Sequence, residues 1–348
     1  MTKNVNSVHL APLLSLCIPT YNRPQEFLRL AECLCIQDRI HEIELVIQDD
    51  SSNYDTLKVV NEILIPAGIN VKYSRGEKIG VDSANLLLIE TAVGKYVWSF
   101  SDDDEMRPGA LAQVISVLES DCNIRYIWAN FDYQTEGRSV VDTTCRYFAS
   151  GDDVINTLGV NIGLISTHIF HREAAIQAIE LARQNLYGFG FAGLIPIFHI
   201  ITNPGRFYLL GTSYILCNPT AQEEIIVLVN RNGNIDNKGF EVYGVHFRHV
   251  VNLFKGRFSN KALRELLSKN FASLWRGMLV GWVGGWDTPK GKRLKMLKIY
   301  WNFPECWVAL PIFCMPLPIV KIFYKIYKIF FRHRKFVLWD KIQARLDK

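Results

Sequence analysis

Short apolar runs alternate with stretches of helical spacing over the first 120 residues. The runs that predict buried strands are 13–18, 43–47, 71–73 and 96–100. Between them, apolar residues recur every three or four positions, which predicts helices near 27–35, 54–64 and 81–92. Strands that alternate with helices of this length predict βαβ units and a mostly parallel sheet. The expected fold class is therefore α/β, a Rossmann-like sheet flanked by helices.

The remaining two thirds of the chain are less regular. Residues 126–131 and 207–210 have the composition of strands, and residues 151–164 and 173–183 have helical spacing. No internal repeat and no low-complexity segment interrupts the sequence. The middle of the chain therefore extends the same α/β body.

Polar side chains follow three of the predicted strands at the point where each strand ends. They are Thr20, Tyr21, Asn22 and Arg23 after the first, Asp49 and Asp50 after the second, and Ser101 to Asp104 after the fourth. The carboxyl ends of parallel strands meet at one edge of a sheet, where ligands bind. Local explanations exist as well, because Asp49 suits an Asx turn and Asn22 suits a helix cap.

Three consecutive aspartates, Asp102, Asp103 and Asp104, repel one another at a strand end. A divalent cation removes that cost, since Mg²⁺ or Mn²⁺ takes one or two carboxylates together with substrate phosphates. Such an ion would neutralise the charge on a departing diphosphate. The alternative is a solvated acidic loop in which Asp104 or Glu105 caps the helix that begins near Pro108.

Charge is divided unevenly along the chain. Residues 289–348, the basic tail, hold 14 Lys and Arg against three acids, whereas the first 288 residues hold 25 bases and 31 acids. A mildly acidic body with a strongly basic tail indicates an anionic partner for the tail. The positive charge accompanies an apolar segment rather than a polar face, so we do not expect a nucleic-acid partner.

The basic tail has the pattern of a segment that lies on a membrane surface. Fifteen uncharged residues run from Cys306 to Val320, fewer than the ~20 apolar residues that a spanning helix needs. Lys321, Lys325 and Lys328 then fall on one helical face beside aromatic and aliphatic residues. This pattern predicts attachment in the headgroup region of an anionic leaflet. A membrane span, a re-entrant hairpin and an ordinary core or oligomer interface remain alternatives.

Taken together, these segments resemble the family 2 glycosyltransferases of the GT-A fold over residues 12–120. The matching stretches are 15–23, 44–52, Gly80 with Asn85, and 94–104 followed by Pro108. The Ser101-Asp-Asp-Asp104 form is similar to the abequosyltransferase-like subgroup of bacterial surface-polysaccharide enzymes. The resemblance implies a nucleotide-sugar pocket lined by Pro19, Thr20, Tyr21, Arg23, Asp49, Asp50, Asn85 and Asp102. It also implies that Asp103 and Asp104 hold Mn²⁺ or Mg²⁺, with Asp103 as the first choice.

The sequence departs from the family pattern in two places. Ser101 stands where the family has a leading aspartate, and residues 187–193 carry no acid where inverting members have an acceptor-activating Glu-Asp pair. Inversion requires a general base within reach of the acceptor hydroxyl. His168, Asp153 and His199 are the candidates, and the base is left unassigned.

The resemblance implies a metal-dependent glycosyltransferase that moves a sugar from a nucleotide-sugar donor to a lipid-linked saccharide acceptor. Such an enzyme would act in O-antigen or capsule synthesis, peripherally on the cytoplasmic face of the inner membrane. We expect residues 1–250 to form the transferase domain, with 12–120 for the donor and 121–250 for the acceptor. Residues 251–348 would form a helical membrane-associating extension. A nucleotidyltransferase is disfavoured because residues 19–24 lack the glycines of a triphosphate loop. A non-catalytic, membrane-docked scaffold remains an alternative.

Overall fold

The computed structural model describes residues 11–133, 143–186, 190–217, 240–283 and 290–330. The chain divides into two compact units, residues 1–218 and 219–348. The predicted boundary at residue 250 stays a prediction. Parts of the basic tail, residues 331–348, lie outside the described residues, as do residues 187–189.

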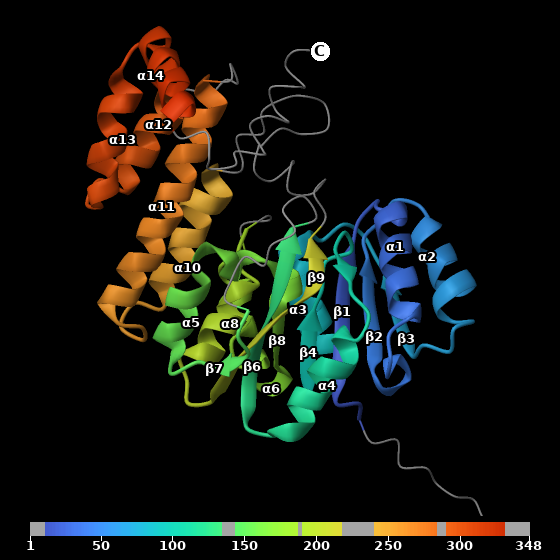
Figure 1. The fold of residues 1–348 in the computed structure, drawn as a ribbon. Coiled ribbons are helices and arrows are strands. Elements are labelled where there is room, and N and C mark those ends of the chain that lie inside the picture. The colour runs from blue at the N-terminus through green and yellow to red at the C-terminus, as the bar shows by residue number, and fades with distance from the viewer. Residues whose placement is uncertain (1–10, 134–142, 187–189, 218–239, 284–289, 331–348) are drawn as a thin grey trace, which may run out of the picture. The chain divides into compact units, whose positions relative to one another are not determined.

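The first unit is built on one nine-stranded sheet (Figure 1). Its strands are β1 (Leu14–Thr20), β2 (Glu44–Asp49), β3 (Val71–Arg75), β4 (Tyr96–Ser99), β5 (Glu105–Met106), β6 (Ile124–Tyr133), β7 (Arg146–Tyr147), β8 (His168–His171) and β9 (Arg206–Cys217). The order is β3-β2-β1-β4-β8-β6-β9-β5, and β7 pairs with β9. Strands β3, β2, β1 and β4 are parallel, and so are β6 and β9, whereas β8 runs antiparallel to both its neighbours. The predicted α/β fold class is confirmed.

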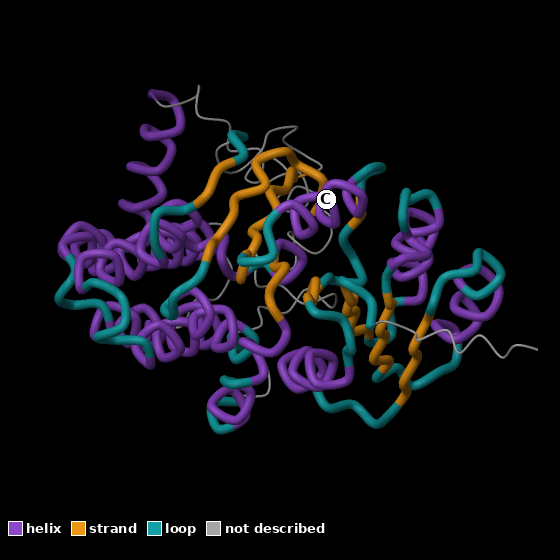
Figure 2. The backbone as a smooth tube through the Cα atoms, turned by 90° about the horizontal axis from the view of Figure 1, so that it is seen from below, coloured by secondary structure: helices purple, strands orange, loops and turns teal. Residues whose placement is uncertain are grey.

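Helices of the first unit follow the strands in the predicted order. They are α1 (Pro24–Cys35), α2 (Asp55–Val59), α3 (Val81–Thr91), α4 (Ala110–Ser120), α5 (Gly151–Leu158), α6 (Arg172–Ile176), α7 (Ile179–Arg183) and α8 (Leu194–Ile201). Short 3-10 or π turns occupy Ile40–Glu42, Val60–Leu64, Gly159–Gly163 and Ile165–Thr167. Crossovers between parallel strands are right-handed, so α1 and α2 share one face of the sheet and α3 lies on the other. Figure 2 shows this layering.

Two predicted helices are broken in the structure. The segment 151–164 is helical only to Leu158, because Gly159 takes a φ of 56° and a 3-10 turn follows. The segment 173–183 is two short helices that meet at Gln177 and Ala178. The break matters for the site, because the 3-10 turn Ile165–Thr167 and strand β8 follow the first helix at the centre of the sheet.

The second unit is helical in its described residues. After a π turn at Phe240–His246 it contains α10 (Phe247–Leu253), α11 (Asn260–Val283), α12 (Lys290–Ile299), α13 (Pro304–Cys314) and α14 (Leu317–Phe330). Its core includes Phe271 stacked on Tyr300, whose hydroxyl donates to Gly244 O at 3.0 Å. Within the described part of the chain, no single helix is long and apolar enough to cross a membrane. Among the described helices, α13 and α14 taken together up to Ile326 have the length and composition of a span, and they are bent by 118°.

Candidate functional site

The polar ends of β1, β2 and β4 meet at one edge of the sheet, as the sequence predicts. The parallel register pairs Thr20 with Asp49, and β4 ends beside β1 two residues before Ser101. Thr20 Oγ1 donates a hydrogen bond of 2.7 Å to Asp102 Oδ2, and both residues are buried. The aspartate run therefore lies against the end of β1, although the two segments are 82 residues apart.

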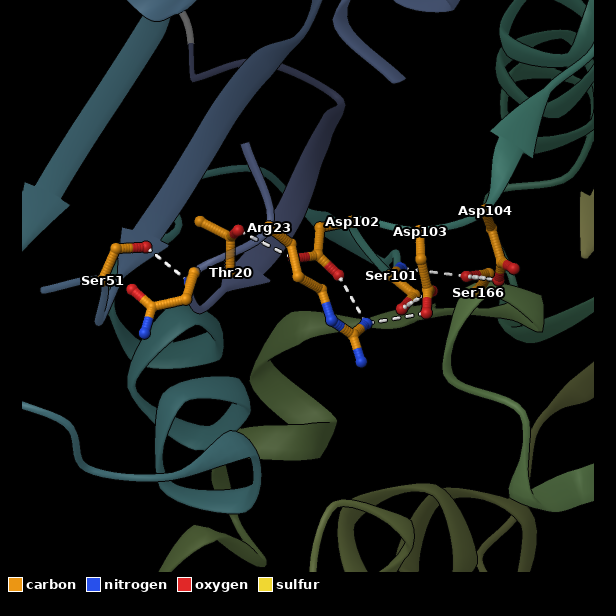
Figure 3. A network of polar contacts seen from close by, with 9 residues as sticks. Thr20, Arg23, Ser51, Ser101, Asp102, Asp103, Asp104 and Ser166 are labelled. Atoms are coloured by element: carbon orange, nitrogen blue, oxygen red, sulfur yellow. Dashed lines mark hydrogen bonds and ion pairs between the residues drawn. The ribbon is translucent and has the colours of Figure 1, made fainter. Parts of the chain in front are cut away.

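Arg23, which precedes α1, supplies the counter-charge to this acidic run. Its Nη1 atom lies 2.7 Å from Asp103 Oδ2 and 3.3 Å from Asp102 Oδ1. The second oxygen of Asp103 accepts from Ser101 Oγ at 2.6 Å. Figure 3 shows this chain of contacts running from Thr20 through Arg23 to Asp103. Arg23 at the start of α1 thus places a positive charge where it could contact the phosphates of a ligand.

Asp104 turns the other way. Its Oδ2 accepts a hydrogen bond of 2.5 Å from Ser166 Oγ, and the same hydroxyl accepts from the backbone N–H of Ser101 (Figure 3). The Cys217 thiol at the end of β9 also lies close to Asp104. Asp104 therefore points away from Asp102 and Asp103, which share the Arg23 guanidinium.

Burial and charge act in opposite directions on Asp102. Burial raises its pKa to about 6, the Arg23 guanidinium lowers it, and the neighbouring Asp103 raises it. Arg23 thus stabilises the negative charge of the aspartates, whose mutual repulsion would otherwise favour their protonated forms. Oxygen ligands of this kind suit Mg²⁺ or Mn²⁺. Among the residues described, no group of three or more His, Cys, Asp or Glu side chains is placed to hold an ion. An ion here would therefore take most of its ligands from phosphate and water.

Asp49 and Asp50 are held by protein donors. Asp49 accepts from Tyr73 Oη at 2.6 Å and from the backbone N–H of Ser51 at 2.8 Å, the contact of an Asx turn. Asp50 accepts from Gln48 Nε2 and from the backbone N–H of Ile79, both at 3.0 Å. These contacts fix both carboxylates at the carboxyl edge of β2.

Two exposed tyrosines lie beside these aspartates, each covered by a cation. Tyr21 is 41% exposed, and Lys78 Nζ lies 3.9 Å from the centre of its ring. Tyr54 is 60% exposed, and the Arg75 guanidinium carbon lies 3.8 Å from its ring centre. Paired rings and cations of this kind can stack a planar base and attract a phosphate.

The other predicted donor-site residues are buried close to this edge. Pro19 lies within β1 opposite Gln48. Asn85 lies on α3, is 7% exposed, and donates from Nδ2 to Val81 O at 3.0 Å. Its role at the donor stays a prediction.

The three candidate bases each have structural partners. His168 on β8 is 3% exposed, and its ring nitrogens contact Tyr126 Oη and Ile162 O at 2.9 Å. Burial lowers the pKa of His168 to about 4. Asp153 accepts from Arg146 at 2.9 Å and from the backbone of Ala149 at 3.0 Å. His199 lies 3.4 Å from Gln177 Oε1. Their catalytic role stays a prediction.

Several residues of this site carried no signal in the sequence. Ser166, Tyr73 and Lys78 contact the predicted residues, but none lies in a matched stretch. Gln48 lies in the matched stretch 44–52, yet its contact with Asp50 is not predicted by the sequence. Tyr73 lies opposite Ile47 in the β2–β3 register, two positions before Asp49, so its contact with Asp49 follows from that register. Ser166 reaches Asp104 only because β8 inserts between β4 and β6.

Comparison with known proteins assigns a family to this part of the chain. The model of the glycosyl transferase family 2 matches residues 15–176. Residues 15–176 belong to that family. The matched region contains every residue of the Thr20–Arg23–Asp102–Asp103 cluster, so the resemblance noted in the sequence is confirmed.

Two bacterial relatives are similar to part of the chain. The abequosyltransferase of Salmonella typhimurium is 30% identical over 114 residues, which are 32% of this chain and 34% of that protein. The GalNAc(5)-diNAcBac-PP-undecaprenol β-1,3-glucosyltransferase of Campylobacter jejuni is 26% identical over 131 residues, 36% of this chain and 40% of that protein. The matched segments thus span well under half of each relative.

Solved structures show the same GT-A fold. Residues 1–349 of Staphylococcus aureus TarS, in complex with UDP-GlcNAc, superpose with a TM-score of 0.57 and 16% identity, covering 84% of this chain and 81% of that one. A Pyrobaculum calidifontis mannosyltransferase in complex with GDP-Man and Mn²⁺ gives a TM-score of 0.50 and 15% identity, with 97% and 86% covered. These likenesses concern the fold.

Proposed function

We propose that this protein transfers a sugar from a nucleotide-sugar donor to a lipid-linked saccharide in bacterial surface-polysaccharide synthesis. The observation that carries the proposal is the cluster of Thr20, Arg23, Asp102 and Asp103 at the carboxyl edge of the parallel strands. Family membership, the UDP-GlcNAc of one structural neighbour and the undecaprenol-linked name of one relative support it.

Different residues bind the base, the ribose and the diphosphate of the donor. Tyr21 and Tyr54 stack the base, Asp49 and Asp50 accept hydrogen bonds from base or ribose, and Arg23 contacts the diphosphate. Asp103 would hold Mn²⁺ or Mg²⁺, and such an ion would supply charge neutralisation for the leaving diphosphate. Arg23 would then be free to contact the diphosphate, since the ion would take over its role as counter-charge to Asp103.

Titration of UDP-, GDP- and CDP-sugars with and without Mn²⁺ tests this proposal. Asp103→Asn should weaken Mn²⁺-dependent donor binding more than about tenfold, ~1.4 kcal/mol. Asp121→Asn is the matched control, because Asp121 is 8% exposed against 9% for Asp103 and pairs with Arg206 at 2.8 Å as Asp103 pairs with Arg23. Donor binding that Asp103→Asn leaves unchanged, or that no nucleotide sugar shows, would refute the metal-donor site.

We further propose that the second unit attaches peripherally to an anionic membrane, on the cytoplasmic face of the inner membrane. Trp307 on α13 is 61% exposed, and Ile322 and Phe323 on α14 are 58% and 59% exposed. Lys321 and Lys325 on α14 are exposed beside them. Large apolar side chains bordered by lysines suit the headgroup region of an anionic bilayer. The side chain of Lys328 lies outside the described residues.

Sedimentation with phosphatidylglycerol vesicles tests the attachment. The double variant Trp307→Ser, Phe323→Ser should lose most vesicle binding. The control pair Ile36→Ser, Ile65→Ser removes side chains of similar exposure, 63% and 54%, from the first unit and should not change binding. Equal binding by both double variants would disprove the attachment.

A further inference from the structure

Two buried oxygen atoms on α3 have no hydrogen-bond partner within the described structure. They are Asp82 Oδ2 and Asn85 Oδ1. The two residues lie three positions apart, so they share one face of the helix, and they are 4% and 7% exposed. Nearly all buried polar atoms in folded proteins are paired. Two unpaired acceptors one turn apart therefore point to a ligand that brings hydrogen-bond donors, as the hydroxyls of a sugar do.

Asp82 also contacts the segment in which the family's acid is missing. The backbone N–H groups of Gly190, Ala192 and Gly193 lie near its carboxylate and favour the charged form. These residues directly precede α8, so the carboxylate lies at the amino end of that helix. Free N–H groups and the helix dipole favour a negative charge there. An acid carried by α3 thus reaches the segment that has none of its own.

The surroundings of Asp82 bring the pKa of its carboxyl close to neutral pH. Burial raises the pKa of Asp82 to about 6, and the three backbone N–H groups oppose the rise. One arginine from α6 and one from α7 bind the other end of α3. Arg172 donates to Ile89 O and Glu90 O, and Arg183 pairs with the Glu90 carboxylate. From β1, Cys17 contacts Leu88 O. A carboxylate that titrates close to the working pH suits proton transfer.

We propose that Asp82 is the general base of the transfer, and that Asn85 Oδ1 accepts a second hydroxyl of the bound saccharide. This assignment rests on the proposed function. The acceptor oxygen forms a bond to the anomeric carbon of the donor sugar as the bond from that carbon to the diphosphate breaks. The diphosphate leaves with the electron pair, and the proton of the acceptor hydroxyl moves to Asp82 Oδ2.

Asp82→Asn separates this role from a structural one. The amide keeps the size and an acceptor oxygen of the carboxylate beside the backbone of Gly190, Ala192 and Gly193, whereas the side chain can no longer take a proton. The assay measures release of nucleoside diphosphate from the tightest-binding sugar nucleotide in a UDP-, GDP- and CDP-sugar panel, with water as the acceptor. We expect kcat to fall ~100-fold or more with donor Kd changed less than about threefold. Asp82→Glu should restore part of the rate, and Asp121→Asn should leave both constants unchanged.

The pH profile supplies a second readout. The wild-type rate should decline below about pH 6, because the base becomes protonated, and the residual rate of Asp82→Asn should lose this limb. Wild-type turnover by Asp82→Asn with intact donor binding would overturn the assignment of Asp82 alone. A wild-type protein that binds no sugar nucleotide in the panel would overturn the proposed function and the base together.

Discussion

Replacement of Arg23 by Gln should change the affinities for metal and donor in opposite directions. Arg23 neutralises Asp102 and Asp103 in the structure. A divalent cation that binds Asp103 must therefore displace this guanidinium. The donor diphosphate, in contrast, needs the same guanidinium as a partner. Loss of Arg23 should make the cation bind more tightly and the donor more weakly.

The contacts of Arg23 set the expected size of both changes. A hydrogen bond between charged groups contributes ~1.5–3 kcal/mol. The Arg23 side chain is 33% exposed, so solvent screening reduces this to about 1–2 kcal/mol. Each 1.4 kcal/mol is about a tenfold change in affinity. We expect Mn²⁺ affinity to rise about tenfold in Arg23→Gln and donor affinity to fall by a similar factor.

Isothermal titration of Mn²⁺ without donor, and of the sugar nucleotide at saturating Mn²⁺, measures both changes. Arg29→Gln is the matched control, because Arg29 lies on α1, the helix that Arg23 precedes, and approaches Glu105 at 3.7 Å. It removes the same charge close by and should leave both affinities within about twofold. An Arg23→Gln protein whose Mn²⁺ affinity is unchanged or lower would refute the reasoning.

Two further predictions concern stability. Gly94→Ala should lower the free energy of unfolding by ~1–3 kcal/mol, because a Cβ there would lie 2.6 Å from Ser15 Oγ and 2.7 Å from Ser15 N; urea denaturation measures this, and Gly291→Ala, with open space around its Cβ, should not destabilise. In the wild type, the free energy of unfolding should fall as the pH is lowered from 6.5 to 4, and His168→Gln should reduce this fall. The buried imidazole stays neutral in the folded protein with a pKa of about 4, whereas the unfolded chain takes up a proton below 6.5, a difference of ~3 kcal/mol. Identical pH dependence of the unfolding free energy in wild type and His168→Gln would contradict it.

The sheet edge could be predicted because its signals are local. Each of β1, β2 and β4 is an apolar run closed by polar residues, and parallel pairing brings such ends together. The contact between Thr20 and Asp102 follows from that arrangement. The breaks at Gly159 and at Gln177 could not be predicted, because helical spacing continues through both. Tertiary packing against the central strands decides where such marginal helices end.

The direction of each carboxylate depends on contacts between segments far apart in the sequence. Asp104 turns away from Asp102 because Ser166 lies beside it, and Ser166 is placed by β8, a four-residue strand with no signal of its own in the sequence. The three aspartates are equivalent in sequence, yet only Asp103 is paired with Arg23 on one side and Ser101 on the other. The choice of Asp103 as metal ligand stays a prediction.

The position of the general base is likewise not visible in the local sequence. Residues 187–193, where the family pattern has its acid, contain none. A general base, however, is defined by its position relative to the acceptor hydroxyl and by its pKa, and neither requires a particular place in the chain. Asp82 is 108 residues before Gly190 in the sequence, yet the backbone N–H groups of that residue's segment lie near its carboxylate. Because α3 and the start of α8 meet in the folded protein, an acid lost from one element can be supplied by the other.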